Sequence, residues 1–218
     1  DAGGKPAGVS VDLARALGEY LHRPVEIQNL PFDGLIPSVK TGRIDLIISS
    51  MTATPERARA VSFSDPYLTT GLCLLVGKKS PIHSIADMDQ KNRTVAVKQG
   101  TTGHLFTRNF KHARVLVLDR ESACVLEVVQ SKVDAFIYDQ LSILKHAEQN
   151  PDSTRAILQP FQTESWAVAL RKDNDPLRQE VNAFLRDFRS SGGFDRLGDR
   201  WLQEPKKAFM RLGVPFVF

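Results

Sequence analysis

Hydroxyl groups gather in one short stretch of the sequence, residues 44–67 (IDLIISSMTATPERARAVSFSDPY). The apolar run at residues 44–48 predicts a strand buried on both faces. Ser49, Ser50 and Thr52 follow at the end of that strand. Because α/β proteins bind ligands beyond the carboxyl ends of their strands, we expect these hydroxyls to face a ligand.

A predicted helix start directly after these hydroxyls adds a positive charge. Thr54 suits the N-cap position, and Arg57 falls in the first turn. A helix start favours an anion, and a guanidinium binds both oxygens of a carboxylate as a planar fork. The residues therefore predict a carboxylate site. A plain helix cap, with Arg57 paired to Glu56 or Asp65, explains them equally well.

A second polar cluster, residues 98–103 (KQGTTG), follows a predicted strand at residues 94–97 and precedes a helix. Glycine-rich turns of this kind can present backbone N–H groups to an anion. The cluster lacks the terminal Gly-Lys-Ser/Thr of a phosphate loop. Lys98, Thr101 and Thr102 are therefore candidate ligand contacts, although an ordinary turn accounts for the pattern more simply.

A third cluster ends in a carboxylate. Asp139 closes the apolar strand at residues 133–138, and a carboxylate there suits an ammonium partner. It also suits the N-cap of a helix at residues 141–148. Together with the carboxylate site, it describes a trap for a zwitterion. Phe32 then provides an apolar floor for the ligand side chain, or serves as a core aromatic.

Strands and helices alternate along the chain and must position these groups. The predicted strands cover residues 25–27, 44–48, 94–97, 114–117, 135–137 and 166–170, and the predicted helices cover residues 11–21, 34–40, 102–110, 122–130, 141–148, 176–188 and 192–201. Alternation on this scale predicts an α/β fold with mostly parallel sheets flanked by helices. Extended segments at residues 71–79 and 166–172 suit crossings between two lobes. We therefore expect residues 1–75 plus 171–218 to form lobe 1, and residues 76–170 to form lobe 2.

Composition excludes several function classes. The 218 residues carry a net charge of +4, but the 29 basic residues are interspersed with 25 acidic ones, which argues against nucleic-acid binding. The two cysteines and five histidines show no metal-ligand spacing, so we predict no metal site and no cofactor. No apolar run is long enough to span a bilayer. The start of the chain shows no signal-peptide pattern, which is expected of a cytoplasmic protein, a mature secreted one or a shortened chain.

Several ordered motifs together resemble the polar amino-acid solute-binding family that feeds ABC transporters. The motifs are GVSVDL at 8–13, FDGL at 32–35, GRID at 42–45, MTATPER at 51–57, FSDPY at 63–67, VKQGTT at 97–102 and VDAFIYD at 133–139. The resemblance covers nearly the whole chain. It implies a periplasmic-binding-protein fold of two α/β lobes joined by two hinge strands that closes on its ligand. It also implies capture of a free amino acid outside the cytoplasm, for an ABC permease of the inner membrane.

The resemblance implies a role for each candidate residue. Arg57, with Thr52, Ser50 and Thr102, would hold the ligand carboxylate, and Asp139 with Ser50 would hold its ammonium. Phe32 would stack on the ligand side chain, and selectivity would be tuned by Ser49, Lys98, Thr101 and Tyr138. The location implied is periplasmic, with the signal peptide removed, or extracellular on a lipid anchor.

The chain departs from the family pattern at its beginning. Family members start with a strand and an aromatic-proline stretch, and these would precede Asp1. The first strand of lobe 1 is thus expected to be absent, or replaced by residues 213–218 (GVPFVF) or by another chain.

Two other functions suit the same fold. A dehydratase-like enzyme would need an acid or base beyond the groups that anchor a zwitterion, and the sequence shows no evident catalytic residue. A ligand-binding sensor module of a membrane receptor would share both site and fold. We therefore expect a binding protein rather than an enzyme.

Overall fold

The computed structural model describes residues 3–213 and divides into two compact units. Unit 1 comprises Asp1–Thr69 and Ser165–Phe218, and unit 2 comprises Thr70–Glu164. The expected lobe boundaries, after residues 75 and 170, lie a few residues further along the same two strands. Of residues 213–218, proposed above as a replacement strand, residues 214–218 lie outside the described residues.

Two long strands, β2 (Val61–Gly77) and β6 (Thr154–Arg171), run through both units and correspond to the expected hinge strands. Their burial differs along their length, and the part of β2 in unit 2 is almost wholly buried. The described strands follow the order β1-β6-β2-β5-β3-β4.

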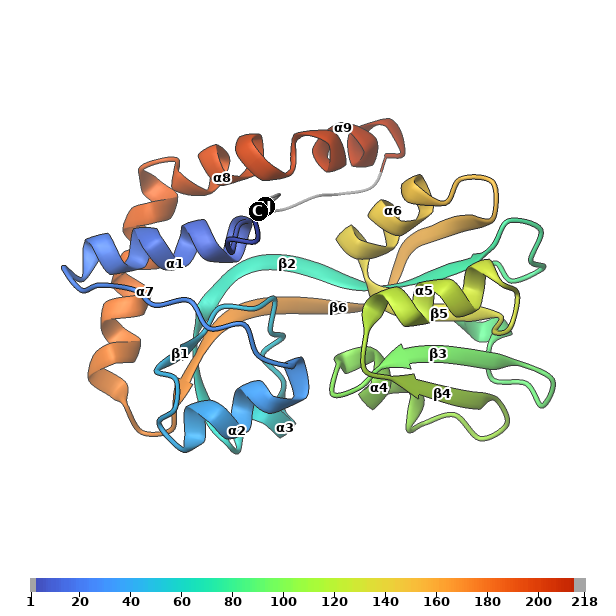
Figure 1. Ribbon diagram of the computed structural model, residues 1–218, viewed down its shortest axis with the longest axis horizontal. Coiled ribbons are helices and arrows are strands. Elements are labelled where there is room, and N and C mark those ends of the chain that lie inside the picture. The colour runs from blue at the N-terminus through green and yellow to red at the C-terminus, as the bar shows by residue number, and fades with distance from the viewer. Residues whose placement is uncertain (1–2, 214–218) are drawn as a thin grey trace. The chain divides into compact units, whose positions relative to one another are not determined.

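Unit 1 combines one short strand with two groups of helices (Figure 1). Its further elements are α1 (Val9–Tyr20), η1 (Phe32–Gly34), α2 (Leu35–Lys40), β1 (Leu46–Ile47), α3 (Pro55–Ala58), α7 (Asp175–Ser190), α8 (Gly193–Trp201) and α9 (Gln203–Arg211). Leu13 and Leu17, one turn apart on α1, are buried, and α1 contacts α7 and α8. A separate apolar cluster of α2, β1 and β2 contains Val39, Ile47 and Val61.

Two strand predictions in unit 1 are wrong in part. Strand β1 covers only Leu46–Ile47, and Ile47 alone in residues 44–48 is buried, because β1 pairs antiparallel with β6 at the edge of the described sheet. Residues 25–27 form no strand in the described structure, and Val25 is 42% exposed. An extended segment gains little stability without a neighbouring strand to satisfy its backbone hydrogen bonds.

Unit 2 is a sheet covered by short helices (Figure 1). Its further elements are η2 (Ile85–Asp87), β3 (Thr94–Lys98), α4 (Thr102–Thr107), β4 (Arg114–Leu118), α5 (Glu121–Val129), β5 (Ala135–Asp139) and α6 (Gln140–Gln149). Strand β3 pairs parallel with β4 and β5, whereas β5 pairs antiparallel with β2. The α/β fold class is confirmed, and the pairings show that the sheet is mixed, with parallel pairs confined to unit 2.

The core of unit 2 forms because alternate residues of its strands are buried on opposite faces. Leu74, Val95 and Ile137 belong to one cluster, against which Phe106 of α4 packs. Their neighbours Leu75, Ala96 and Phe136 are fully buried as well. A sheet buried on both faces holds the ends of β3 and β5 firmly, and Lys98 and Asp139 lie at those ends.

Candidate functional site

The candidate residues fall on both units: Phe32, Ser49, Ser50, Thr52 and Arg57 belong to unit 1, and Lys98, Thr101, Thr102 and Asp139 belong to unit 2. The surroundings of each set are described within its own unit.

In unit 1, residues 51–53 are fixed to strand β6. Ala53 donates a backbone hydrogen bond to the carbonyl of Ser165 at 3.0 Å, and Ala167 donates one to the carbonyl of Met51 at 3.1 Å. Thr52 forms an antiparallel bridge with Trp166 and is buried. The hydroxyl-bearing segment is therefore rigid at this point, which a binding site requires.

Ser50, one residue earlier, has an unusual backbone. Its φ is 51°, in the left-handed region that residues other than glycine seldom occupy. The backbone of Ser50 hydrogen-bonds to the buried hydroxyl of Tyr67. Ser50 itself is exposed and Ser49 is partly buried. Left-handed residues held in this way concentrate at ligand sites, which agrees with the predicted role of Ser50.

Arg57 lies in the first turn of α3, as the sequence predicts. Pro55 is the first helical residue, and the Thr54 hydroxyl caps the helix by accepting the backbone N–H of Arg57 at 3.2 Å. The Arg57 side chain is only 7% exposed, and its Nη1 donates to the Thr52 carbonyl at 2.8 Å. The Asp65 carboxylate, one of the two partners considered from the sequence, lies 3.8 Å from Arg186.

The Phe32 ring lies against this guanidinium. The Arg57 Cζ is 5.5 Å from the ring centroid, and Phe32 also packs on the apolar cluster of α2 and β1. Phe32 therefore packs on the core of unit 1 and also neighbours the candidate carboxylate site, and its role as a floor for the ligand side chain stays a prediction. Unit 1 thus brings Phe32, Thr52 and Arg57 together.

In unit 2, the turn after β3 is organised by Thr101. Its hydroxyl donates to the Lys98 carbonyl at 2.7 Å and accepts the His104 backbone N–H at 3.4 Å, so Thr101 caps α4. Thr101 and Thr102 are both buried. A Cβ on Gly103 would lie 2.9 Å from the Ile137 carbonyl oxygen, so only glycine lets α4 approach β5 this closely. Unit 2 thus joins Lys98 to Thr101 through a hydrogen bond.

Asp139, the last residue of β5, caps α6. Its Oδ1 accepts the Ser142 backbone N–H at 3.0 Å, so the N-cap role considered from the sequence is present. The pKa of Asp139 is raised to about 6, mainly by burial and also by the charges of Glu121 and Glu164, while hydrogen bonds from Ser142 oppose the shift. A partly buried carboxylate that two other carboxylates repel is the environment that an incoming cation would stabilise.

Sequence reasoning did not identify Glu121, Glu164 or His146. Glu164 is 3% exposed on β6, and Glu121 begins α5. Glu121 and Glu164 each lie more than fifteen residues from Asp139 in the chain, and no motif links them. Glu164 precedes the predicted strand at residues 166–170, and its burial appears only in the folded structure.

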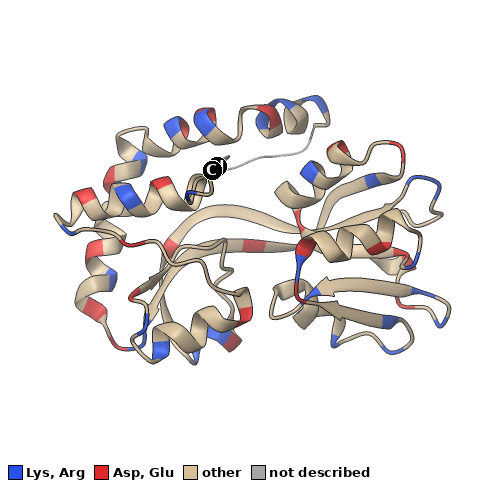
Figure 2. Ribbon diagram, viewed as in Figure 1, with Lys and Arg blue, Asp and Glu red and all other residues tan. Residues whose placement is uncertain are grey.

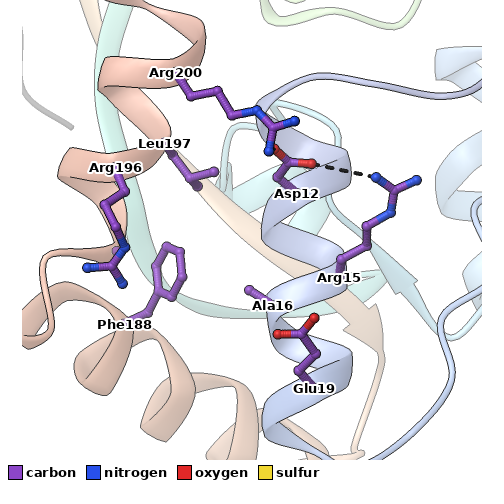
Figure 3. Close-up of a pocket in the computed structure, with 9 residues that line it drawn as sticks. Asp12, Arg15, Ala16, Glu19, Phe188, Arg196, Leu197 and Arg200 are labelled. Carbon is purple, nitrogen blue, oxygen red and sulfur yellow. Dashed lines mark ion pairs between the residues drawn. The ribbon is translucent and has the colours of Figure 1, made fainter.

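A hollow of about 340 Å³ opens on unit 1, and none of the candidate residues lines it (Figure 3). It is lined by residues of α1, α8 and the end of α7: Asp12, Arg15, Ala16, Glu19, Phe188, Gly193, Arg196, Leu197 and Arg200. Arg15 and Arg200 pair with Asp12 at 3.7 and 3.0 Å, and Trp201 donates to the same carboxylate at 2.8 Å. Since these charges satisfy one another, the hollow is a feature of helix packing.

Charge is not concentrated in either unit. Figure 2 shows basic and acidic segments interspersed along the helices and loops of both units. Among residues 3–213, no group of three histidine, cysteine or acidic side chains could hold a metal ion. None of the helices in that range has the length and apolar character needed to cross a membrane.

The chain is similar to known amino-acid-binding proteins. The chain is 27% identical over 204 residues to the ABC transporter glutamine-binding protein GlnH of Bacillus subtilis (strain 168). The match covers 92% of this chain and 74% of that protein. An ancestral arginine-binding protein bound to arginine superposes with a TM-score of 0.87 at 32% identity, covering 92% of this chain and 90% of that one. The ancestral amino acid-binding protein AncCDT-1, a precursor of cyclohexadienyl dehydratase, superposes with a TM-score of 0.84 at 32% identity, over 92% and 87% of the two chains.

The family assignment follows from a match over almost the whole chain. The model of the bacterial extracellular solute-binding proteins, family 3, matches residues 1–204. That range contains every candidate residue of both units. The relatives of the chain are amino-acid-binding proteins of ABC transporters. The chain belongs to the bacterial extracellular solute-binding proteins, family 3.

Proposed function

We propose that this chain binds a free amino acid outside the cytoplasm and delivers it to an ABC permease of the inner membrane. The observation that carries the proposal is Arg57: a guanidinium, 7% exposed, in the first helical turn after a hydroxyl-rich segment. Relatives of the chain bind arginine, glutamine and cystine, and these amino acids share an α-carboxylate and an α-ammonium group. Members of the family are extracellular solute-binding proteins, which supports the proposal that this protein is periplasmic or lipid-anchored.

In unit 1, we assign the ligand α-carboxylate to Arg57. The guanidinium is held by its hydrogen bond to the Thr52 carbonyl and by its contact with the Phe32 ring, so its position is set before ligand arrives. Preorganisation of this kind reduces the entropy lost on binding. The hydroxyls of Ser50 and Thr52 lie in the same segment and supply further hydrogen-bond donors, and Ser49 precedes them.

In unit 2, we assign the α-ammonium to Asp139. An ammonium group would neutralise a partly buried carboxylate on which the charges of Glu121 and Glu164 act. Lys98, Thr101 and Thr102 lie on the neighbouring strand end and turn, from which they would contact the ligand. The ligand side chain would lie against Phe32.

One observation favours a second function, that of a dehydratase-like enzyme. A carboxyl group with a pKa of about 6 can act as a general acid near neutral pH, and Asp139 has that property. The similarity to AncCDT-1, a precursor of cyclohexadienyl dehydratase, points the same way. We favour binding, because the raised pKa is also what an unfilled ammonium site would show.

A melting-temperature screen against the twenty standard amino acids and prephenate-like acids separates the two functions. Ligand that binds the native state raises the melting temperature by mass action. We expect one or a few amino acids to raise it and to be recovered unchanged. Stabilisation by prephenate-like acids with release of product would establish the enzyme, and no stabilisation by any amino acid would refute the binding function.

A further inference from the structure

A cluster of ionisable side chains in unit 2 is not used by the roles assigned above. Glu121 begins α5, and its Oε1 lies 2.5 Å from Nε2 of His146 on α6. The hydroxyl of Tyr138 on β5 also hydrogen-bonds to Glu121. The Lys98 Nζ lies 5.9 Å from the centroid of the Tyr138 ring. Glu121 is thus connected through Tyr138 to two candidate ligand contacts, Lys98 and the adjacent Asp139.

Glu121 is held in its charged form. Burial would raise its pKa, but the hydrogen bond from His146 and the charges of His146, Lys98 and Lys145 outweigh burial, so its pKa lies below the ordinary value. Lys98 is therefore near enough to act on Glu121 electrostatically. An anion and a cation at such positions offset each other's field.

Glu121 is thus a carboxylate that acts on Lys98. Glu121 and Glu164 also act on Asp139, and its pKa reflects both charges. The basic groups that act on Glu121 are Lys98, Lys145 and His146. Lys98 lies at the end of β3 beside the turn of Thr101, whereas Lys145 and His146 lie on α6.

We propose that Glu121, held by His146 and Tyr138, is a specificity-determining residue of the amino-acid site: it offsets the charge of Lys98, so that the site disfavours acidic side chains and accepts neutral or cationic ones. The inference rests on the proposed function, since it concerns the ligand of the same site. Glu121 acts through Lys98 and Tyr138, and is therefore a positioning residue.

The test compares Glu121→Gln with a matched control on the same helix, Glu127→Gln. Both substitutions remove one negative charge from α5, but Glu127 lies two turns away from the cluster. Association constants for L-arginine and L-glutamate are measured by isothermal titration calorimetry. We expect Glu121→Gln to lower the ratio of the arginine constant to the glutamate constant at least tenfold, and Glu127→Gln to leave it within threefold of the unsubstituted protein. If glutamate binding is too weak to measure, the arginine constant itself should fall at least tenfold.

A second variant keeps the inference testable if Glu121→Gln does not fold, which a thermal melt would reveal. Lys98→Gln leaves Glu121 without its partner charge, so the ratio should move in the opposite direction, further toward arginine. The double variant should lie between the two single variants. An unchanged ratio in folded Glu121→Gln, or a shift toward glutamate in Lys98→Gln, would overturn the inference. Failure of every standard amino acid to bind the unsubstituted protein would instead refute the proposed function.

Discussion

Arg57 in unit 1 and Asp139 in unit 2 are the two charged groups proposed for opposite ends of the ligand, and their surroundings differ. Arg57 contacts a backbone carbonyl and an aromatic ring, which leave its charge state unchanged. Asp139 is partly buried, the charges of two other carboxylates act on it, and its pKa is raised to about 6. One anchor is permanently charged, and the other titrates close to neutral pH.

Because only one of the two anchors titrates near neutral pH, the two units should affect the pH dependence of ligand affinity differently. A guanidinium remains protonated throughout the physiological pH range, so unit 1 should attract a carboxylate at any pH at which the protein is folded. Unit 2 should bind an ammonium group only when Asp139 has lost its proton. Substitutions in unit 1 should therefore change affinity at all pH values, while those in unit 2 should also change its dependence on pH.

The largest effect is expected from Arg57→Ala. Loss of a charge-assisted pair from a desolvated site should cost about 2–5 kcal/mol of binding free energy, which is tens to thousands of fold in Kd. Calorimetry with the amino acid identified by the melting screen measures it. Far-ultraviolet circular dichroism serves as the control for folding, because Arg57 also holds the Thr52 carbonyl. Affinity near that of the unsubstituted protein would show that Arg57 is only a structural residue of the α3 start.

Asp139→Asn should have a smaller effect on binding and almost none on the helix cap. Asparagine caps a helix about as well as aspartate, so α6 should retain its N-cap. Loss of the charge should weaken ligand binding at least tenfold at pH 7, where most of Asp139 is ionised. A parallel measurement of the melting temperature distinguishes the two roles. Unchanged affinity together with unchanged stability would mean that Asp139 is a cap and nothing more.

Local signals in the sequence were sufficient for the fold class and for the position of Arg57. The order of apolar strands and polar turns predicts the elements of unit 2, and Thr54-Pro55 predicts the start of α3, because capping and turn chemistry act over a few residues. The prediction of a strand at residues 25–27 was wrong, because a strand needs a partner strand and the local sequence does not specify one.

The environment of Asp139 could not be predicted from the sequence. Its pKa depends on burial and on Glu121 and Glu164, which approach it only after β5, α5 and β6 have packed. The link between His146 and Glu121 likewise joins two helices across 25 positions of the chain. Periodicity and motif spacing report local structure, so the charged contacts that tune a site remain hidden until tertiary structure is known.

The smallest effect is the pH dependence itself, and it tests the comparison most directly. With a pKa of about 6 in the folded, unliganded protein, Asp139 must lose its proton before it pairs with an ammonium group. Linkage then makes binding about tenfold weaker at pH 5 than at pH 7, because about one proton is released per ligand bound at the lower pH.

The stability of the unliganded protein should change with pH in the opposite sense. The folded-state pKa lies above the ordinary value of 3.8, so the stabilising contribution of the protonated form is complete below that value and is lost as pH rises through about 6. Titrations in two buffers of different ionisation enthalpy measure the released proton, and Asp139→Asn serves as the control that should abolish this step. Equal affinities at pH 5 and pH 7 in the unsubstituted protein would mean that the ligand ammonium does not depend on Asp139.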